Sequence, residues 1–279
     1  MSDQVWLITG CSSGFGRELA LAAVAAGDRV MATARQPDRL ADLVDAGDGR
    51  VRTAALDVTD DQQVADAVAR TIDEFGRIDV VVNNAGNGSV GAVEELDLKD
   101  LRALLDVMFF GAVAVTKAAL PHLRAQGSGA IVQISSMGGQ LSMPGYGAYC
   151  AGKFALEGIS EALAAEVAPF GIRVLIVEPG SFRTEFGGQR MHRSRTIDAY
   201  EVSTAATRAA VENMDGTQPG DPRKAALAIL EVLHSPEPPL RLALGNDAVD
   251  AIGAHQEQVR GDLRRWEQVS RATDLDGPA

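Results

Sequence analysis

A tyrosine and a lysine four residues apart are the first side chains in the chain with an evident chemical use. Tyr149 and Lys153 are separated by Cys150-Ala151-Gly152, a spacing that places both side chains on one face of a helix. A tyrosine with an ordinary pKa of about 10 is a poor base near neutral pH, but a neighbouring ammonium group favours its phenolate. The pair could therefore exchange a proton with a substrate.

A serine hydroxyl is expected to lie near this pair. Ser136 follows a β-branched run at residues 130–135. It is therefore expected at the carboxyl edge of a parallel sheet, where ligands of doubly wound sheets bind. An alternative is that Ser136 serves only the turn, since Ser135-Ser136 also precedes Gly138-Gly139.

Glycines follow the first apolar run of the chain. The turn from Thr9 to Gly16 has the spacing G-x-x-x-G-x-G and leads into an amphipathic segment. Glycines allow a tight turn and a close approach of backbone to a pyrophosphate, and the N-terminus of the next helix attracts the phosphates. The turn is thus a candidate nucleotide site, with a purely structural turn as the alternative.

The residue after the second apolar run predicts which nucleotide binds. NAD-binding proteins carry Asp or Glu at this point for the ribose hydroxyls, whereas this chain has Ala34-Arg35. A guanidinium group there suits a 2′-phosphate through paired, charge-assisted hydrogen bonds. We therefore predict NADP (NADPH) as the cofactor, the alternative being that Arg35 is a solvated strand-end residue.

These residues require an alternation of strands and helices to position them. Short β-branched runs alternate with longer segments whose apolar residues recur every three or four positions. The predicted strands are residues 5–9, 29–34, 51–56, 78–83, 130–135, 172–178 and 240–244. The predicted helices are residues 16–26, 61–75, 98–124, 151–170, 223–234 and 247–270. We predict one α/β domain over residues 1–279, with a doubly wound parallel sheet and a substrate-loop insertion at about 185–220.

Charge and composition exclude several other classes of function. The net charge of -12 argues against nucleic acid or an anionic membrane as a partner, because both need a basic surface. The two cysteines and four histidines do not have metal-ligand spacing, so no metal is predicted. No leader and no long uninterrupted apolar stretch is apparent. We expect a cytoplasmic protein that acts on a small molecule.

Taken in order, these motifs resemble those of the classical short-chain dehydrogenases/reductases. The resemblance runs from Val5 to about Thr184, and the tail from Asp221 to Trp266 resembles the branch near retinol and 17β-hydroxysteroid dehydrogenases. It rests on the turn of residues 9–16, Asn83-Asn84-Ala85-Gly86, Ser136, Tyr149 with Lys153, and Pro179-Gly180 followed by Thr184. It implies a Rossmann-type sheet of about seven strands in the order 3-2-1-4-5-6-7.

The resemblance also implies a role for each site residue. Tyr149 would be the acid/base, Lys153 would lower its pKa and bind the nicotinamide ribose, and Ser136 would polarise the substrate oxygen. Arg35 would hold the 2′-phosphate. The other residues implied for the cofactor are Gly10, Ser12, Ser13, Phe15, Gly16, Asp57, Val58, Asn84, Ala85, Gly86, Pro179, Gly180, Phe182 and Thr184. The reaction would be hydride transfer between the nicotinamide and a carbonyl or secondary alcohol.

The substrate and the assembly are predicted from residue types. Large apolar side chains on segments expected to wall the pocket suggest a bulky apolar substrate, or they pack the loop on the sheet. These residues are Met137, Leu141, Met143, Tyr146 and Phe186. Small residues along the tyrosine helix, together with the resemblance, predict a homodimer or homotetramer. They are Ala151, Ala155, Gly158, Ala162 and Ala165.

One residue departs from the family pattern. In the run Val107-Met108-Phe109-Phe110-Gly111, Met108 stands where the family carries an asparagine of its proton relay. A thioether cannot donate a hydrogen bond and accepts only weakly. An alternative function is therefore an NADP(H)-binding sensor or scaffold with impaired turnover.

Overall fold

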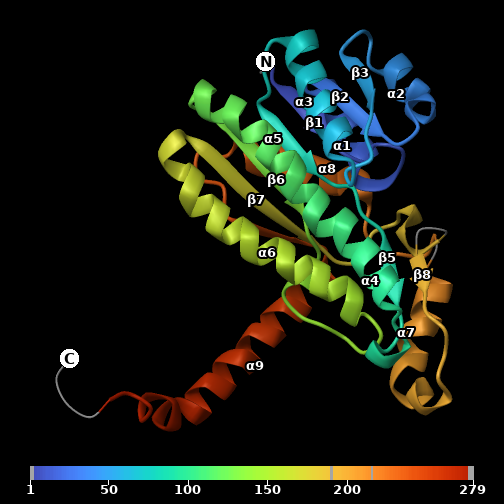
Figure 1. The fold of residues 1–279 in the computed structure, drawn as a ribbon, viewed down its shortest axis with the longest axis vertical. Helices are drawn as coiled ribbons and strands as arrows, with labels where there is room; N and C mark the ends of the chain where they lie inside the picture. The colour runs from blue at the N-terminus through green and yellow to red at the C-terminus, as the bar shows by residue number, and fades with distance from the viewer. Residues whose placement is uncertain (1–2, 189–190, 215, 276–279) are drawn as a thin grey trace.

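The central element is a parallel sheet of seven strands in the order β3-β2-β1-β4-β6-β7-β9 (Figure 1). The computed structural model describes residues 3–188, 191–214 and 216–275. The strands are β1 (Val5–Ile8), β2 (Arg29–Ala34), β3 (Val51–Ala55), β4 (Val80–Asn83), β6 (Gly129–Ile134), β7 (Ile172–Pro179) and β9 (Arg241–Leu244). Numbered along the chain within this sheet, the order is 3-2-1-4-5-6-7, which confirms the predicted doubly wound fold.

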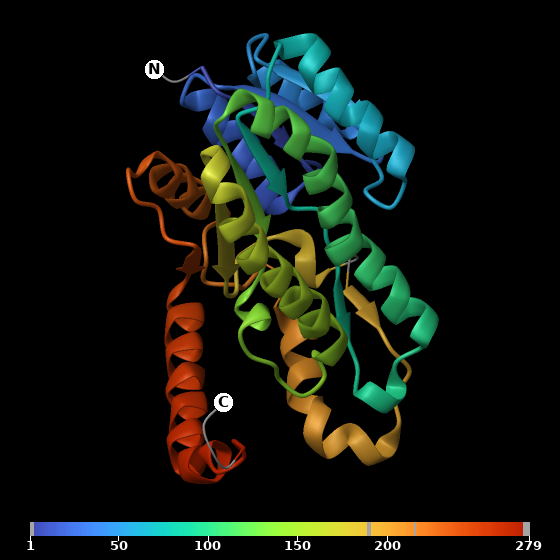
Figure 2. The ribbon, with the colours of Figure 1, turned by 60° about the vertical axis from the view of Figure 1, so that its left-hand side comes forward.

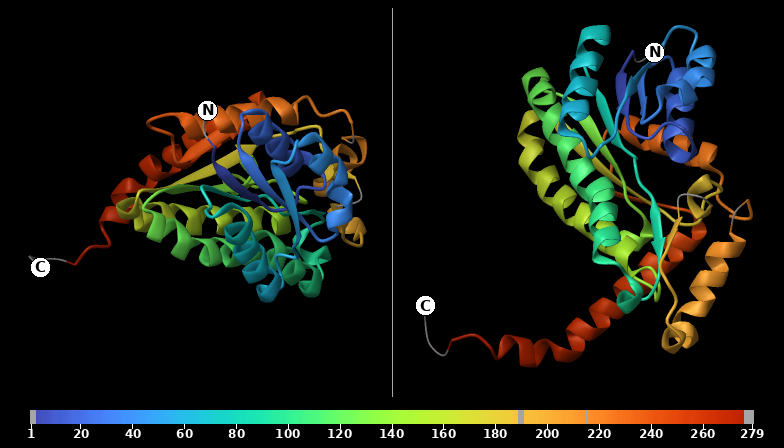
Figure 3. Two further views of the ribbon diagram at one scale, coloured as in Figure 1. Left: turned by 90° about the horizontal axis from the view of Figure 1, so that it is seen from above. Right: turned by 45° about the vertical axis from the view of Figure 1, so that its right-hand side comes forward.

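Helices cover both faces of this sheet, as the view from above shows (Figure 3). The helices α1 (Gly14–Ala25) and α8 (Pro222–His234) lie on one face, and α3 (Asp61–Phe75), α5 (Gly111–Gln126) and α6 (Gly147–Val167) lie on the other. Successive strand residues point to opposite faces. Trp6 and Ile8 therefore pack towards α1, while Leu7 packs towards α3 and α5.

The predicted helix at residues 98–124 contains a break in its regular winding. It consists of α4 (Leu98–Leu105), the π-helical turn η3 (Asp106–Phe110) and α5. Such single π turns occur frequently at functional sites, and this one carries the buried Met108. The stretch Leu98–Gln126 is long and apolar enough to cross a membrane by composition alone, yet its α5 part packs into the core beneath the sheet.

The insertion after β7 contains regular structure that the sequence did not predict. β8 (Met191–Arg193) pairs with β5 (Gly88–Val90), and α7 (Glu201–Asn213) follows. The buried Glu95 carboxylate accepts hydrogen bonds from the Ala92 and Ile197 backbone N–H groups at 2.7 and 2.8 Å and pairs with Arg208 of α7. These contacts hold the insertion against the body. The short helices α2 (Ala41–Ala46) and η1 (Pro37–Leu40) were also not predicted.

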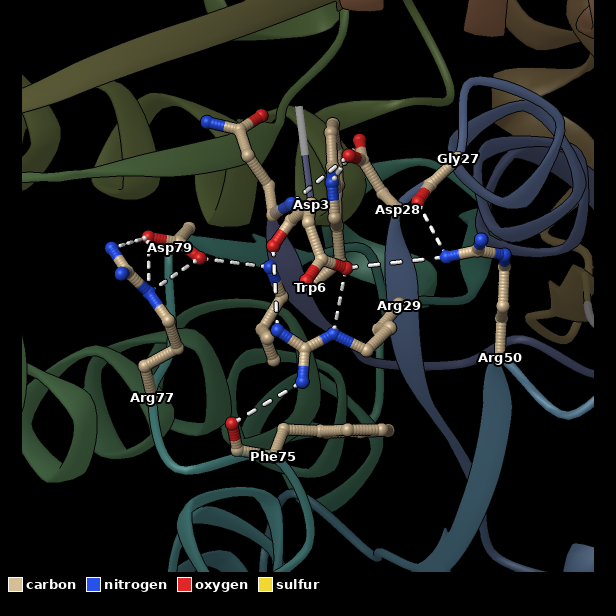
Figure 4. A network of polar contacts seen from close by, with 11 residues as sticks. Asp3, Trp6, Gly27, Asp28, Arg29, Arg50, Phe75, Arg77 and Asp79 are labelled. Atoms are coloured by element: carbon tan, nitrogen blue, oxygen red, sulfur yellow. Dashed lines mark hydrogen bonds and ion pairs between the residues drawn. The ribbon is translucent and has the colours of Figure 1, made fainter. Parts of the chain in front are cut away.

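Charged side chains form a network of hydrogen bonds and ion pairs at the amino ends of the strands (Figure 4). The Asp28 carboxylate accepts from the indole Nε1 of Trp6 at 3.0 Å. Asp79 accepts from the backbone N–H of Val5 at 2.9 Å and pairs with Arg77. Ligands of doubly wound sheets bind at the carboxyl ends of the strands. This network lies at the opposite edge of the sheet.

The last helix, α9 (Asn246–Arg271), leaves the body of the protein (Figures 1 and 2). Ala248 and Ile252 in its first two turns are buried. The residues from 256 to 271 are all exposed. The predicted helix at residues 247–270 is therefore present, and it projects from the domain.

Candidate active site

The glycine turn after β1 is locked against the end of β4. Gly10 has a φ of +71°, and a Cβ there would lie 3.1 Å from the Ala85 Cα atom. A Cβ on Gly16 would lie 2.8 Å from the Gly10 carbonyl oxygen and collide with the Asn84 amide. The Asn84 Nδ2 donates to the Thr9 carbonyl oxygen at 2.8 Å. Only glycine fits at these two turn positions.

The N-terminus of α1 opens into a cleft that suits an anion. Within the described chain, its N-cap Ser13 makes no side-chain capping hydrogen bond, so the first N–H groups and the positive helix end remain available. The cleft around it is lined by charged and small residues: Ser12, Ser13, Gly14, Arg17, Glu18, Arg39, Asp42, Arg183, Thr184, Glu185, Gly216 and Pro222. The lining holds three arginines and three carboxylates, so the positive end of α1 is the feature that favours a phosphate there.

The three predicted catalytic residues meet in an adjoining cavity at the carboxyl ends of β6 and β7. Ser136, Tyr149 and Lys153 all line this cavity, which shares Ser13, Gly14, Thr184 and Glu185 with the cleft.

Two hydrogen bonds position the catalytic side chains. The Ser136 hydroxyl accepts from the Gly138 backbone N–H at 3.0 Å. The Lys153 Nζ atom donates to the Ile134 carbonyl oxygen at 2.7 Å and lies 5.8 Å from the centre of the Tyr149 ring.

Burial controls the ionisation of this group of residues. It raises the pKa of Tyr149 above its ordinary value, against the opposing effect of a hydrogen bond with Ser136. Burial also lowers the pKa of Lys153 to about 8, against the opposing charge of Glu157. At neutral pH, Tyr149 is therefore a phenol and Lys153 is mostly an ammonium group. The lowering of the Tyr149 pKa by Lys153 stays a prediction.

The predicted cofactor residues fall into three groups. Those that line the catalytic cavity are Ser13, Phe15, Asn84, Gly86, Pro179, Gly180, Phe182 and Thr184, together with Tyr149 and Lys153. Ser12 lines the cleft, Gly10 and Gly16 belong to the glycine turn, and Ala85 follows β4 and packs against Gly10. Arg35 is exposed directly after β2, Asp57 accepts from Thr59, and Val58 is buried against Gly111. The adenosine roles of these last three residues stay predictions.

The substrate side of the cavity is largely apolar. Met137, Met143, Tyr146 and Phe186 line it, whereas Leu141 is not among the described lining residues. Met108, singled out at the family's relay position, also lines it, and the lining residues that were not predicted include Asn87, Cys150, Met214 and Gln218. Met214 and Gln218 come from the insertion, where no periodic pattern marked them. Within the described chain, the Gln218 Oε1 and Asn87 Oδ1 atoms are buried without a hydrogen-bond partner.

Comparison with known proteins gives close matches over nearly the whole chain. A solved short-chain dehydrogenase from Streptomyces avermitilis is 52% identical, with a TM-score of 0.93 over 98% of this chain and 100% of that one. The 3-ketodihydrosphingosine reductase of Bacteroides thetaiotaomicron is 39% identical over 88% of this chain and 89% of that protein. Retinol dehydrogenase 8 of Bos taurus is 37% identical over 84% of this chain and 79% of that protein.

The family itself is matched directly. The family model described as short chain dehydrogenase matches residues 4–194, which include the glycine turn, the serine and the tyrosine–lysine pair. The fold and the relatives agree with this match. This chain belongs to the short-chain dehydrogenase family of oxidoreductases.

Proposed function

We propose that this protein is an NADP(H)-dependent oxidoreductase that transfers a hydride between the nicotinamide and the carbonyl or secondary alcohol carbon of a bulky apolar substrate. The observation that carries this proposal is the meeting of Ser136, Tyr149 and Lys153 in one cavity that joins the cleft at the α1 N-terminus. When bound, the cofactor supplies the hydride donor or acceptor.

The residues of this chain would move the proton. In the reductive direction, the Tyr149 phenol donates its proton to the substrate oxygen, and the Ser136 hydroxyl hydrogen-bonds to the same oxygen. Burial raises the pKa of Tyr149 above its ordinary value, so at neutral pH the side chain carries the proton that this step requires. The Lys153 ammonium beside the ring stabilises negative charge that develops on the phenolic oxygen.

The proposed preference for NADPH rests on the residues around the adenosine end. Arg35 follows β2 directly and is exposed, and Arg39 lines the cleft. Guanidinium groups bind phosphate oxygens through paired hydrogen bonds. The 2′-phosphate of NADPH supplies such oxygens, and NADH lacks them.

The proposed substrate class rests on the cavity walls. Met137, Met143, Tyr146, Phe186 and Met214 present apolar surface next to the catalytic hydroxyl groups. Two relatives are named for apolar substrates, 3-ketodihydrosphingosine and retinol. A ketone or alcohol with a long or bulky hydrocarbon part matches both observations.

A substrate panel tests the reaction and the assigned acid/base together. NADPH consumption is measured with long-chain and ring ketones, and NADP reduction with the corresponding alcohols. Tyr149→Phe should abolish turnover and leave the NADPH dissociation constant nearly unchanged, because the hydroxyl acts only in the chemistry. Tyr146→Phe, which removes a hydroxyl from the same cavity, is the matched control and should retain most of kcat. A Tyr149→Phe enzyme with a tenth of the wild-type kcat or more would show that another group moves the proton.

A sensor or scaffold that binds NADP(H) without efficient turnover is the second candidate. The observation that favours it is the buried Met108 at the position of the family's asparagine. Tight NADPH binding with no turnover across the whole panel would support it over the oxidoreductase.

For either function, we propose a single domain with its substrate loop at about residues 185–220, acting in the cytoplasm as a homodimer or homotetramer.

A further inference from the structure

Two side-chain amides at the catalytic cavity have an oxygen atom without a partner. Asn87 and Gln218 both line the cavity that contains Ser136 and Tyr149. Within the described residues, the Asn87 Oδ1 and Gln218 Oε1 atoms are buried and accept no hydrogen bond. A buried acceptor that is left unsatisfied costs about 1–3 kcal/mol, and the large majority of such atoms in folded proteins have a partner. A molecule that enters the cavity can supply that partner.

Gln218 is held in place by hydrogen bonds to the loop after β7. The residue is only 4% exposed. The Arg183 guanidinium donates to the Gln218 carbonyl oxygen from Nε at 3.2 Å and from Nη2 at 3.1 Å. The Arg183 backbone N–H donates to the Gly220 carbonyl oxygen at 2.9 Å, and the Gly220 N–H donates to that of Ser181 at 3.0 Å. The amide of Gln218 therefore lies on a segment whose backbone is fixed.

Asn87 lies beside the catalytic pair. It follows Gly86, where a Cβ atom would lie 4.0 Å from the Lys153 Nζ atom. It precedes Gly88, where a Cβ atom would lie 2.9 Å from the Phe186 ring. The strand β5, which begins at Gly88, pairs with β8 of the insertion (Figure 1). Asn87 is therefore placed between the ammonium group that serves the reaction and the apolar wall of the cavity.

The catalytic donors of the cavity already have partners. The Lys153 Nζ atom donates to the Ile134 carbonyl oxygen at 2.7 Å, and Tyr149 shares a hydrogen bond with Ser136. Much of the remaining wall consists of thioether and aromatic side chains, and a thioether has no hydrogen to donate. These residues include Met137, Met143, Phe186 and Met214. The ligand is thus left to supply a donor to the two amide oxygens.

The charge of the cavity favours a neutral donor over a cationic one. Lys153 lines the cavity and is mostly an ammonium group at neutral pH, because its pKa is about 8. This charge disfavours a second cation nearby, and a buried cation needs an anionic partner, which a neutral amide is not. The one carboxylate among the described lining residues, that of Glu185, is on an exposed residue. A hydroxyl group supplies a donor without a charge.

We propose that Asn87 and Gln218 form a polar subsite that binds a hydroxyl group of the substrate. Because Asn87 lies beside Lys153, this hydroxyl is close to the reacting carbon. The preferred substrate is then an apolar ketone with a hydroxyl group next to its carbonyl, or the diol formed by its reduction. The subsite adds binding and orientation, and the hydride and proton transfers stay as proposed above. The inference rests on the proposed reaction and is independent of the preference for NADPH.

Three matched ketones test the subsite in the wild-type protein with NADPH. They are a long-chain methyl ketone, its derivative with a hydroxyl group on the methyl carbon, and the methyl ether of that derivative. The ether keeps the electron-withdrawing oxygen and lacks only the donor. The hydroxy ketone should have a kcat/KM at least about tenfold above that of the ether, which is about 1.4 kcal/mol. Equal values for the hydroxy ketone and its ether would overturn the subsite and leave the proposed reaction intact.

Variants at the two amides identify the groups responsible. Gln218→Met and Asn87→Leu each replace an amide with an apolar side chain of similar size, and each should lose most of the preference for the hydroxy ketone over its ether. Met214→Leu changes another cavity residue of the insertion without removing an amide, so it is the matched control and should retain the preference. The NADPH dissociation constant should stay near the wild-type value. Weaker NADPH binding with an unchanged preference would assign the amide to the cofactor and refute the proposal.

Calorimetric titration of the ketones into the complex of Tyr149→Phe with NADPH gives a reading without turnover. The hydroxy ketone should bind at least about tenfold more tightly than its ether, and adding Gln218→Met should remove most of this difference. Equal binding of the two ketones would show that the subsite is wrong. Tighter binding of the hydroxy ketone, together with no turnover of any ketone by wild type, would support the subsite and refute the proposed reaction.

Discussion

At the residue scale, burial of Lys153 determines the pH at which the charge beside Tyr149 is lost. Its side chain is 6% exposed, and its Nζ atom has the Ile134 carbonyl oxygen as an acceptor at 2.7 Å. Burial lowers its pKa, while the Glu157 carboxylate, one helical turn further along α6, raises it. The charge next to Tyr149 therefore depends on pH near the physiological range.

The first prediction concerns the pH dependence of the reduction reaction. Because burial lowers the pKa of Lys153 to about 8, its ammonium form is present below that pH and is lost above it. We expect kcat/KM to fall as pH rises through about 8. Glu157→Gln removes the carboxylate that raises this pKa, so its profile should fall at lower pH than that of wild type. An unchanged profile in the variant would contradict this assignment, as would a flat wild-type profile through this range.

Met108 is a residue at which the structure revises the family pattern. Its side chain is 1% exposed and packs with Leu104 and Ala148. The Lys153 ammonium has a carbonyl acceptor from Ile134, so the lysine is positioned without a side-chain amide at residue 108. An asparagine at this position would instead bury a polar amide among apolar neighbours.

Met108→Asn should therefore destabilise the protein without accelerating it. We expect the free energy of unfolding to fall by about 1–3 kcal/mol, measured by urea denaturation, and kcat not to rise. Met108→Leu is the control, because it keeps an apolar side chain of similar size and should keep both quantities near wild type. A clear rise in kcat of Met108→Asn would show that the amide relay of the family is needed here too.

At the element scale, a buried polar cluster joins α6, β7 and β9 to the turn after Ser136. The Arg241 guanidinium lies 3.0 Å from the Glu157 carboxylate and 3.5 Å from that of Glu178. The Gln140 Nε2 donates to Glu178 at 2.8 Å. Burial and the nearby Glu157 charge raise the pKa of Glu178 to about 7, and the charge of Arg241 only partly offsets them. Ionisation of the folded Glu178 therefore costs free energy that its ionisation in the unfolded chain does not cost.

This cluster predicts how stability depends on pH. A carboxyl group whose pKa is raised on folding contributes stability below its unfolded pKa and loses that contribution as pH rises to the folded value. Between the ordinary pKa of 4.5 and about 7, wild type should therefore lose stability relative to Glu178→Gln, which cannot ionise. Thermal unfolding of both proteins across this range measures the difference. Parallel curves would mean that Glu178 is not the titrating group.

The elements differ in how well the sequence predicts them. Buried parallel strands are recognisable because both faces are apolar, and the strand at Arg29–Ala34 was predicted to the residue. The strands β5 and β8 have only three residues each, too few for an alternating pattern. The helix α7 was missed because few of its residues are buried. Its position depends instead on the ion pair between Arg208 and Glu95, two residues far apart in the sequence.

At the scale of the whole molecule, the site is assembled from the ends of several strands and from the insertion. Residues fixed by motif and sheet position, such as Ser136 and Tyr149, could be predicted, because a doubly wound sheet brings strand ends to one edge. Met214 and Gln218 could not be predicted as site residues, because the fold of the insertion rather than a local sequence pattern places them in the cavity. The reaction type is thus better specified by the sequence than the substrate is.

The last prediction concerns the stability of the whole domain when the cofactor binds. A ligand that binds only the folded protein stabilises it by an amount set by its concentration and dissociation constant. At equal saturating concentrations, NADPH should therefore stabilise the protein more than NADH by about 1–3 kcal/mol, as for a charge-assisted pair at Arg35. For a large domain this is about 2–4 °C of Tm for each kcal/mol. Arg35→Ala should lose most of this difference, whereas Arg70→Ala, which removes an exposed arginine of α3, should retain it. Equal shifts with both cofactors in wild type would remove the basis for NADPH preference and leave the family assignment intact.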